Sequence, residues 1–231
     1  MKKRQGRAKK KHYHLWDIPR KYFPRNTKAV EYVTDLMRLT SNLDHTNRRI
    51  QYSAQICTFN VKSINQKSKL FLPKPTDVFR EMDEFVYHYE NYCYRLYAYR
   101  EKLLQFINAI LPFGYSESQV RIEHIVINPI VRRAGIIKLI EKFRKNTSLN
   151  KLIQDRKNLT HKLCYENDCD HFLRPKIKTA PKTPDQERQW FNSWKKQITT
   201  RSQHVNICCK TISDINNVLA EKIISYKKSK P

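Results

Sequence analysis

Residues 76–110, TDVFREMDEFVYHYENYCYRLYAYREKLLQFINAI, decide the fold. Their apolar side chains recur three and four positions apart, a spacing that places them on one face of an α-helix. Thr76 or Asp77 can cap the start, and Pro112 with Gly114 ends the pattern. The stretch therefore predicts one long amphipathic helix. Its apolar positions are Phe79, Met82, Phe85, Val86, Tyr89, Cys93, Leu96, Leu103, Leu104, Ile107 and Ile110.

The middle of this helix is crowded with tyrosines. One interpretation is a helical core in which aromatic rings pack inside and hydroxyls reach the rim, which is the commoner arrangement. The other is a set of platforms on which RNA bases stack. Spacing alone does not separate the two. The tyrosines are Tyr87, Tyr89, Tyr92, Tyr94, Tyr97 and Tyr99.

The rest of the chain continues the helical pattern. Only three glycines occur, too few for the turns of an all-β protein or for a dinucleotide-binding loop. We therefore expect an all-α, up-and-down bundle of four to five long helices. The further expected helices are one from Asn26 to about Leu70, a short one from Ser116 or Ser118 to Asn128, one over 136–143, one capped by Thr147 or Ser148, and a long one that Thr183-Pro184 opens after a loop over 166–181.

Charge divides the chain into three expected parts. A disordered basic arm covers residues 1–14, a single helical domain covers 15–226, and a basic tail covers 227–231. The formal net charge is +25, from 46 lysines and arginines against 21 acids. A polyanion such as RNA would relieve this repulsion, so we favour a nucleic-acid partner over a merely solvated basic surface.

The sequence also bears on location and redox state. No apolar run approaches the ~20 residues of a membrane span, and the N-terminus lacks the core of a signal peptide. We therefore expect a cytoplasmic protein with no membrane partner. The six cysteines follow no regular framework, which favours reduced thiols.

One hexapeptide, Arg156-Lys157-Asn158-Leu159-Thr160-His161, carries the strongest chemical signal. Arg156 falls in the middle of an apolar helical stripe, and a guanidinium there must face a carboxylate, a hydrated groove or an anion. His161 lies about 140° further round the helix. Two copies of the chain could bring an arginine and a histidine together on one phosphate, which predicts a homodimer. The stripe is Leu149, Leu152, Ile153, Leu159 and Leu163.

A metal site competes for the same part of the chain. His161, Cys164, Cys169 and His171 are four zinc-type ligands within eleven residues. Their order matches no common zinc module, so we expect no metal and no other cofactor.

An all-helical chain with this Arg-x4-His motif resembles the HEPN superfamily, the higher-eukaryote and prokaryote nucleotide-binding domains. The similarity is strongest between residues 87 and 162. It rests on residues 94–104 (YRLYAYREKLL), on Ile107-Asn108 and on the hexapeptide, which together look like a stand-alone bacterial HEPN family.

The resemblance implies a metal-independent endoribonuclease, dimeric, of toxin–antitoxin or antiphage systems, with an antitoxin or other defence partner. Arg156 and His161 would be catalytic and would leave a 2′,3′-cyclic phosphate. RNA contacts are expected from Lys157, Asn158, Lys162 and Arg100, with Glu101 and Tyr99 in support. Glu101 could pair with Lys102 or Arg95, or supply the carboxylate that Arg156 needs.

The hexapeptide departs from the family pattern at one position. Lys157 stands where a small polar residue such as asparagine is common, and Asn158 follows one place later. This departure leaves open an alternative, a non-catalytic RNA- or nucleotide-binding module in a regulatory or defence complex.

Overall fold

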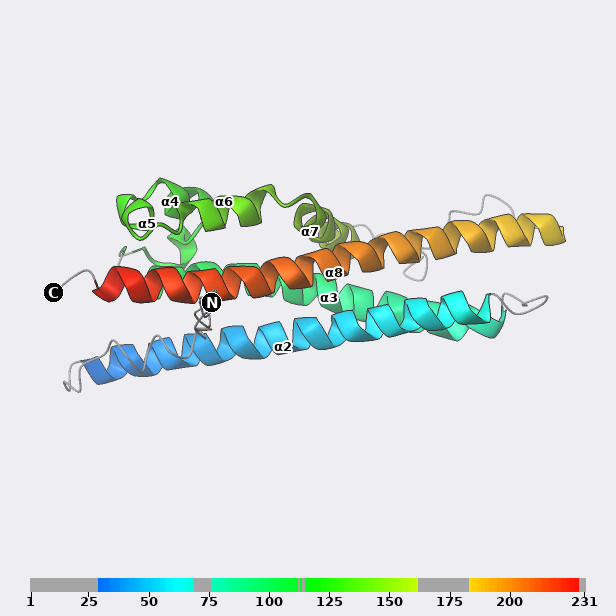
Figure 1. The fold of residues 1–231 in the computed structure, drawn as a ribbon, viewed down its shortest axis with the longest axis horizontal. Helices are drawn as coiled ribbons and strands as arrows, with labels where there is room; N and C mark the ends of the chain where they lie inside the picture. Colours follow the sequence, from blue (N-terminus) through cyan, green and yellow to red (C-terminus); the bar gives the residue numbers. More distant parts are fainter. Residues whose placement is uncertain (1–28, 69–75, 112, 114, 162–182, 229–231) are drawn as a thin grey trace, which may run out of the picture.

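The computed structural model describes residues 29–68, 76–111, 113, 115–161 and 183–228. Three long helices run side by side along the molecule (Figure 1). They are α2 (Ala29–Lys67), α3 (Thr76–Ile110) and α8 (Pro184–Lys228). The colours of Figure 1 show that α2 runs opposite to both α3 and α8. The expected all-α bundle is confirmed, and the described residues contain no strand.

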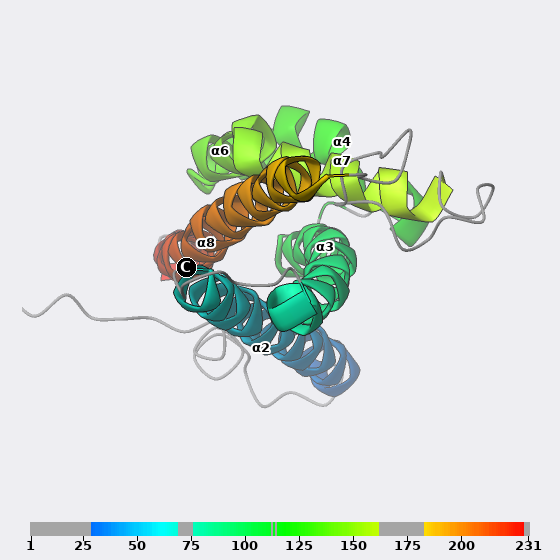
Figure 2. The ribbon, with the colours of Figure 1, turned by 90° about the vertical axis from the view of Figure 1, so that its right-hand side faces the viewer.

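Short helices connect the end of α3 to the start of α8. They are α4 (Ile122–Ile127), α5 (Pro129–Arg133), α6 (Ile137–Lys145) and α7 (Thr147–His161), preceded by a 3₁₀ turn, η1 (Glu117–Gln119). They form a further layer on the bundle, and α7 packs against both α3 and α8 (Figure 2). Together they take the place of one long helix running opposite to α3 and α8.

Local chemistry explains why this connection consists of short helices. Pro129 cannot donate a backbone hydrogen bond, and the side chain of Asn128 caps α5 by accepting from the amide of Ile130 at 2.9 Å. Gly135 follows with a φ of 69°, a left-handed conformation that glycine adopts without strain. Each feature stops one helix before the next begins.

The caps of α7 and α8 differ in how well the sequence predicted them. The cap of α7 was expected at Thr147 or Ser148 and is instead Asn146, whose side-chain oxygen accepts from the amide of Leu149 at 2.9 Å. Asn and Ser are comparable caps, so composition alone does not choose between neighbours. The cap of α8 is Thr183, as predicted, because its hydroxyl accepts from the amide of Gln186 at 3.3 Å.

The core lies where α2, α3 and α8 meet, and buried tyrosines of α3 tie the helices together. The hydroxyl of Tyr92 donates to the carbonyl of Val205 at 3.2 Å, and that of Tyr99 donates to the side chain of Asn216. Both partners lie on α8. The core interpretation of the tyrosines therefore holds for these two, with hydroxyls satisfied across helices.

Some expected segments fall outside the described residues. These are the basic arm over 1–14, the start of the first helix at Asn26 and the loop over 166–181. At the other end, α8 continues to Lys228, into the basic tail expected over 227–231.

Two neighbouring residues of α8 test where the core lies. Leu219 is fully buried and Val218 is 37% exposed. Leu219→Ala should lower the free energy of unfolding by about 2–5 kcal/mol, because it leaves a cavity. Val218→Ala should change it by less than about 0.5 kcal/mol. Urea denaturation followed by circular dichroism measures both, and equal losses would contradict this placement of the core.

Candidate functional site

Arg156 lies on α7 against the tyrosines of α3. Its neighbours on the stripe, Leu149 and Leu152, are buried, while Arg156 itself is half-buried. The guanidinium carbon stands 4.3 Å from the centre of the Tyr97 ring and 5.9 Å from that of Tyr94. Both distances are within the range of cation–π attraction. An aromatic surface therefore meets the guanidinium, which is a neighbour that the sequence did not lead us to expect.

A second cation shares the Tyr97 ring. The guanidinium carbon of Arg100 stands 4.8 Å from the same ring centre. Glu101 pairs with Arg100, accepting from its Nε at 3.1 Å and its Nη2 at 2.9 Å. Glu101 therefore has a partner, Arg100, that the sequence did not lead us to expect. Two guanidinium groups next to one neutral ring repel each other, and a bound anion would reduce that repulsion.

The other expected site residues occupy varied positions. Lys157 is exposed, and Asn158 is half-buried with its side-chain oxygen 3.4 Å from Nε2 of Gln154. Tyr99 is buried in the core rather than beside Arg156. His161 is the last residue of α7, its side chain is outside the described part of the structure, and so is Lys162.

The residue before Arg156, Asp155, is the buried charge that the sequence analysis overlooked. Its carboxylate is 1% exposed. One carboxylate oxygen accepts from the Tyr89 hydroxyl at 2.5 Å and lies 2.7 Å from Nε of Arg201 on α8. The other lies 3.8 Å from Nζ of Lys151. The Tyr89 hydroxyl and the opposite charges of Arg201 and Lys151 offset part of the desolvation penalty of this buried carboxylate.

This Asp155 cluster, defined as Asp155, Tyr89 and Arg201, joins three helices. Tyr89 comes from α3, Asp155 from α7 and Arg201 from α8. Because successive helical residues are ~100° apart, fixing Asp155 also fixes the direction in which Arg156 leaves α7. The cluster therefore holds α7 in the rotation that lays Arg156 on Tyr97.

Burial around the cluster shifts the pKa values of nearby groups in the direction that favours their neutral forms. Burial raises the pKa of the Tyr89 hydroxyl well above its ordinary value, so Tyr89 is a donor to Asp155 at neutral pH. Burial, and then the charge of Arg201, lowers the pKa of His204. His204 is consequently neutral near pH 7, and the positive charge facing Asp155 comes from Arg201 and Lys151.

A signal in the sequence could have found this cluster. Asp155 stands three residues after Leu152, on the apolar side of α7, and Arg201 stands between Ile198 and Val205 on the apolar side of α8. Opposite charges at core positions of two different helices indicate a buried ion pair.

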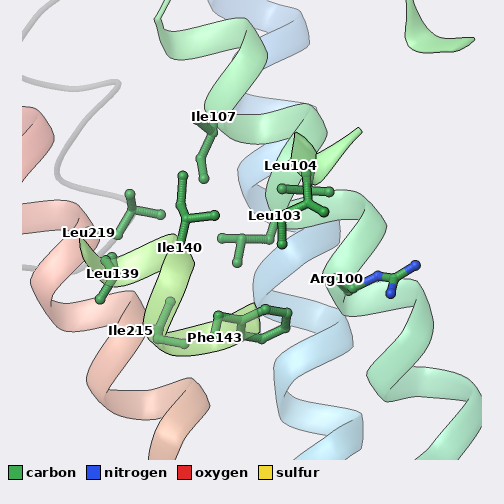
Figure 3. A pocket seen from close by; sticks show the side chains of 10 residues that line it. Arg100, Leu103, Leu104, Ile107, Leu139, Ile140, Phe143, Ile215 and Leu219 are labelled. Atoms are coloured by element: carbon green, nitrogen blue, oxygen red, sulfur yellow. The ribbon is translucent and has the colours of Figure 1, made fainter. Parts of the chain in front are cut away.

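The structure also has a small apolar hollow between α3, α4, α6 and α8 (Figure 3). Aliphatic residues and Phe143 line it, and the guanidinium of Arg100 points away from them (Figure 3). This lining offers no acid, base or nucleophile for chemistry. We interpret the hollow as imperfect packing of the short helices on the bundle.

The expected metal ligands lie almost wholly outside the described residues. Nothing is seen of Cys164, Cys169 and His171, and only the backbone of His161 is described. Within the described ranges no three histidine, cysteine or acidic side chains gather as a metal site would require. Burial raises the pKa of the Cys57 and Cys208 thiols to about 12, which keeps both protonated.

A family model described as HEPN_Cthe2314-like HEPN matches residues 32–220. The chain belongs to this HEPN family. Neither a curated protein nor a solved structure matched it. Membership makes this HEPN chain a nucleotide-binding or ribonuclease-type module, and it indicates interaction with nucleic acid or another subunit. The match covers α3, α7 and most of α8, the helices that hold Arg156 in place.

As for membranes, none of the described helices combines the length and the apolar character that a crossing would need.

Asp155→Asn tests the cluster. The change leaves Arg201 without its opposite charge, so the free energy of unfolding should fall by about 3–5 kcal/mol. Asp155→Asn with Arg201→Gln should lose less than the two single changes added, because the pair is lost only once. Denaturant titrations give all three values. As a control, Glu84→Gln breaks an exposed pair with Arg80 and should change stability by less than about 1 kcal/mol. A similar small loss for Asp155→Asn would contradict the anchoring role.

Proposed function

We propose that this HEPN protein is a metal-independent endoribonuclease that acts as a dimer in a toxin–antitoxin or antiphage system. The observation that carries the proposal is Arg156, held on α7 by the Asp155 cluster and laid on the Tyr97 ring at 4.3 Å. An arginine in a fixed position, in a chain with a net charge of +25, is suited to a phosphate. In the proposal, a single HEPN domain spans residues 15–226, with the basic arm and tail adding affinity for RNA.

The proposed reaction is an internal transesterification. The ribose 2′-oxygen attacks the adjacent phosphorus, the bond from phosphorus to the leaving 5′-oxygen breaks, and a 2′,3′-cyclic phosphate remains. His161 would take the proton from the 2′-hydroxyl or give one to the 5′-oxygen. Arg156 would stabilise the charge that grows on the phosphate oxygens. Lys157, Asn158, Lys162 and Arg100 would bind flanking phosphates or bases, and no metal takes part.

The two groups would come from different protomers. Arg156 and His161 are five residues apart on α7, which separates their directions by about 140° and their positions by about 7.5 Å along the axis. Two α7 helices close to a two-fold axis would bring the Arg156 of one protomer to the His161 of its partner.

A second candidate is a non-catalytic RNA- or nucleotide-binding module. It is favoured by Lys157, an exposed cation where the family commonly has a small polar residue, since such a cation binds phosphate without performing chemistry. Tight, salt-sensitive binding with intact RNA would support this candidate.

Cleavage in EDTA decides between the two. The wild-type protein should cut single-stranded RNA and leave cyclic phosphate ends. His161→Ala should slow cleavage by about 10²-fold or more, and Arg156→Ala by a similar factor. Arg132→Ala, which removes an exposed arginine of α5, is the matched control and should cleave normally. The nuclease proposal is contradicted if the wild-type protein leaves the RNA intact, or if His161→Ala cleaves it as fast as the wild type does.

Mixing two inactive variants tests the composite site. Arg156→Ala and His161→Ala subunits should each be inactive alone. After subunit exchange, half of the dimers carry one intact site, so the mixture should recover roughly a quarter of wild-type activity. Gel analysis of a labelled RNA measures the recovery. No recovery, with exchange verified by native mass spectrometry, would mean that each site lies within one protomer.

A further inference from the structure

The structure separates the tyrosines of α3 into two sets. Tyr89, Tyr92 and Tyr99 are fully buried. Each of their hydroxyls is bonded across a helix interface, so their role in the core is complete. Tyr87, Tyr94 and Tyr97 face outward to differing degrees, with Tyr87 63% and Tyr94 44% exposed. Packing in the core explains the first set, but it does not explain the exposed rings of Tyr87 and Tyr94 in the second.

The outward tyrosines share one side of α3. Tyr87 and Tyr94 are seven residues apart, which is two turns and about 10.5 Å along the axis. Tyr97 follows three residues later, where Arg156 and Arg100 cover part of its ring. We call these three tyrosines with the two arginines the α3 tyrosine strip. It runs from an exposed aromatic end to a cationic end at α7.

Aromatic contacts extend the strip towards α2. The ring of His88 meets Tyr87 edge-on at 5.1 Å between ring centres, and it meets Tyr52 of α2 edge-on at 6.4 Å. Tyr52 is 62% exposed. Such edge contacts hold the Tyr87 ring in place while most of its surface stays open.

The cationic end of the strip suits a polyanion. Arg156 and Arg100 stand at that end, where Glu101 pairs with Arg100. Two other acids lie near the strip: Glu84, which pairs with Arg80, and Glu90, which is half-buried between Tyr87 and Tyr94 along α3. The chain as a whole carries a net charge of +25. Exposed aromatic rings next to arginines can bind unpaired bases by stacking and the backbone by charge.

We propose that the α3 tyrosine strip binds single-stranded RNA, with unpaired bases stacked on Tyr87 and Tyr94 and a backbone phosphate at Arg156 and Arg100. The proposal rests on the proposed function and names its substrate class. In an A-form duplex the base faces are stacked inside and cannot reach the rings. The strip therefore selects unpaired segments such as loops and tails, and it delivers the backbone to α7.

The test measures binding without cleavage. A 2′-O-methyl RNA lacks the attacking hydroxyl, so it remains intact whether or not the protein is a nuclease. Fluorescence anisotropy with the full chain should give tighter binding of this probe as a single strand than as a duplex. Tyr87→Ala and Tyr94→Ala should each weaken single-strand binding about tenfold, because base–aromatic stacking is lost. Duplex binding should not change.

Two controls sharpen the test. Tyr87→Phe and Tyr94→Phe keep the ring and should bind like the wild type. Phe59→Ala removes a 68% exposed aromatic side chain of α2, outside the strip, and should have no effect. Circular dichroism establishes that each variant is folded, which the exposure of these rings leads us to expect.

Three outcomes would overturn the proposal. The first is an equal loss of affinity for the single strand and for the duplex. The second is a loss of affinity for Phe59→Ala as large as for Tyr94→Ala. The third is a change in the molecular mass of the alanine variants, measured by light scattering, while RNA binding persists. The last would make the strip a contact between two copies of the chain. If the wild-type protein does not cleave RNA but its single-strand binding still depends on the strip, only the proposed nuclease activity is contradicted. If it cleaves RNA but its binding does not depend on the strip, only the proposal for the strip is contradicted.

Discussion

The arrangement of this molecule depends on one buried carboxylate. Asp155 is almost fully enclosed on α7, and its Oδ2 is held by Tyr89 of α3 and Arg201 of α8. A buried charge that loses either partner becomes expensive, so the interaction specifies how the three helices pack as well as stabilising them. Apolar contacts alone specify one packing arrangement less sharply, because hydrophobic side chains of similar volume can replace one another.

The same constraint links the fold to the candidate site. Arg156 follows Asp155 directly, so the rotation that buries one residue presents the other to Tyr94 and Tyr97. The ring of Tyr97 then offsets part of the charge of Arg156 without neutralising it. The guanidinium is thereby held in position with its charge intact, which is the state that phosphate binding needs.

Arg156 and the buried tyrosines show different limits of prediction from sequence. The sequence showed that Arg156 interrupts an apolar stripe, and it showed the Arg-x4-His motif. It did not show the neighbours of Arg156, because cation–π contacts depend on which rings of a second helix face outward. Likewise the six tyrosines looked equivalent in sequence, while burial separates Tyr89, Tyr92 and Tyr99 from the rest.

The sequence by itself determined that the chain is helical, where its long helices lie, that Thr183 opens the last one, and which family it belongs to, because periodicity, caps and motifs are local properties. Only the tertiary structure decided that short helices form the return to α8, that Asp155 pairs with Arg201, and that Glu101 binds Arg100. These features depend on distances between residues far apart in the chain, or on competition between neighbouring groups. Spacing along one helix carries no information about the helix opposite it.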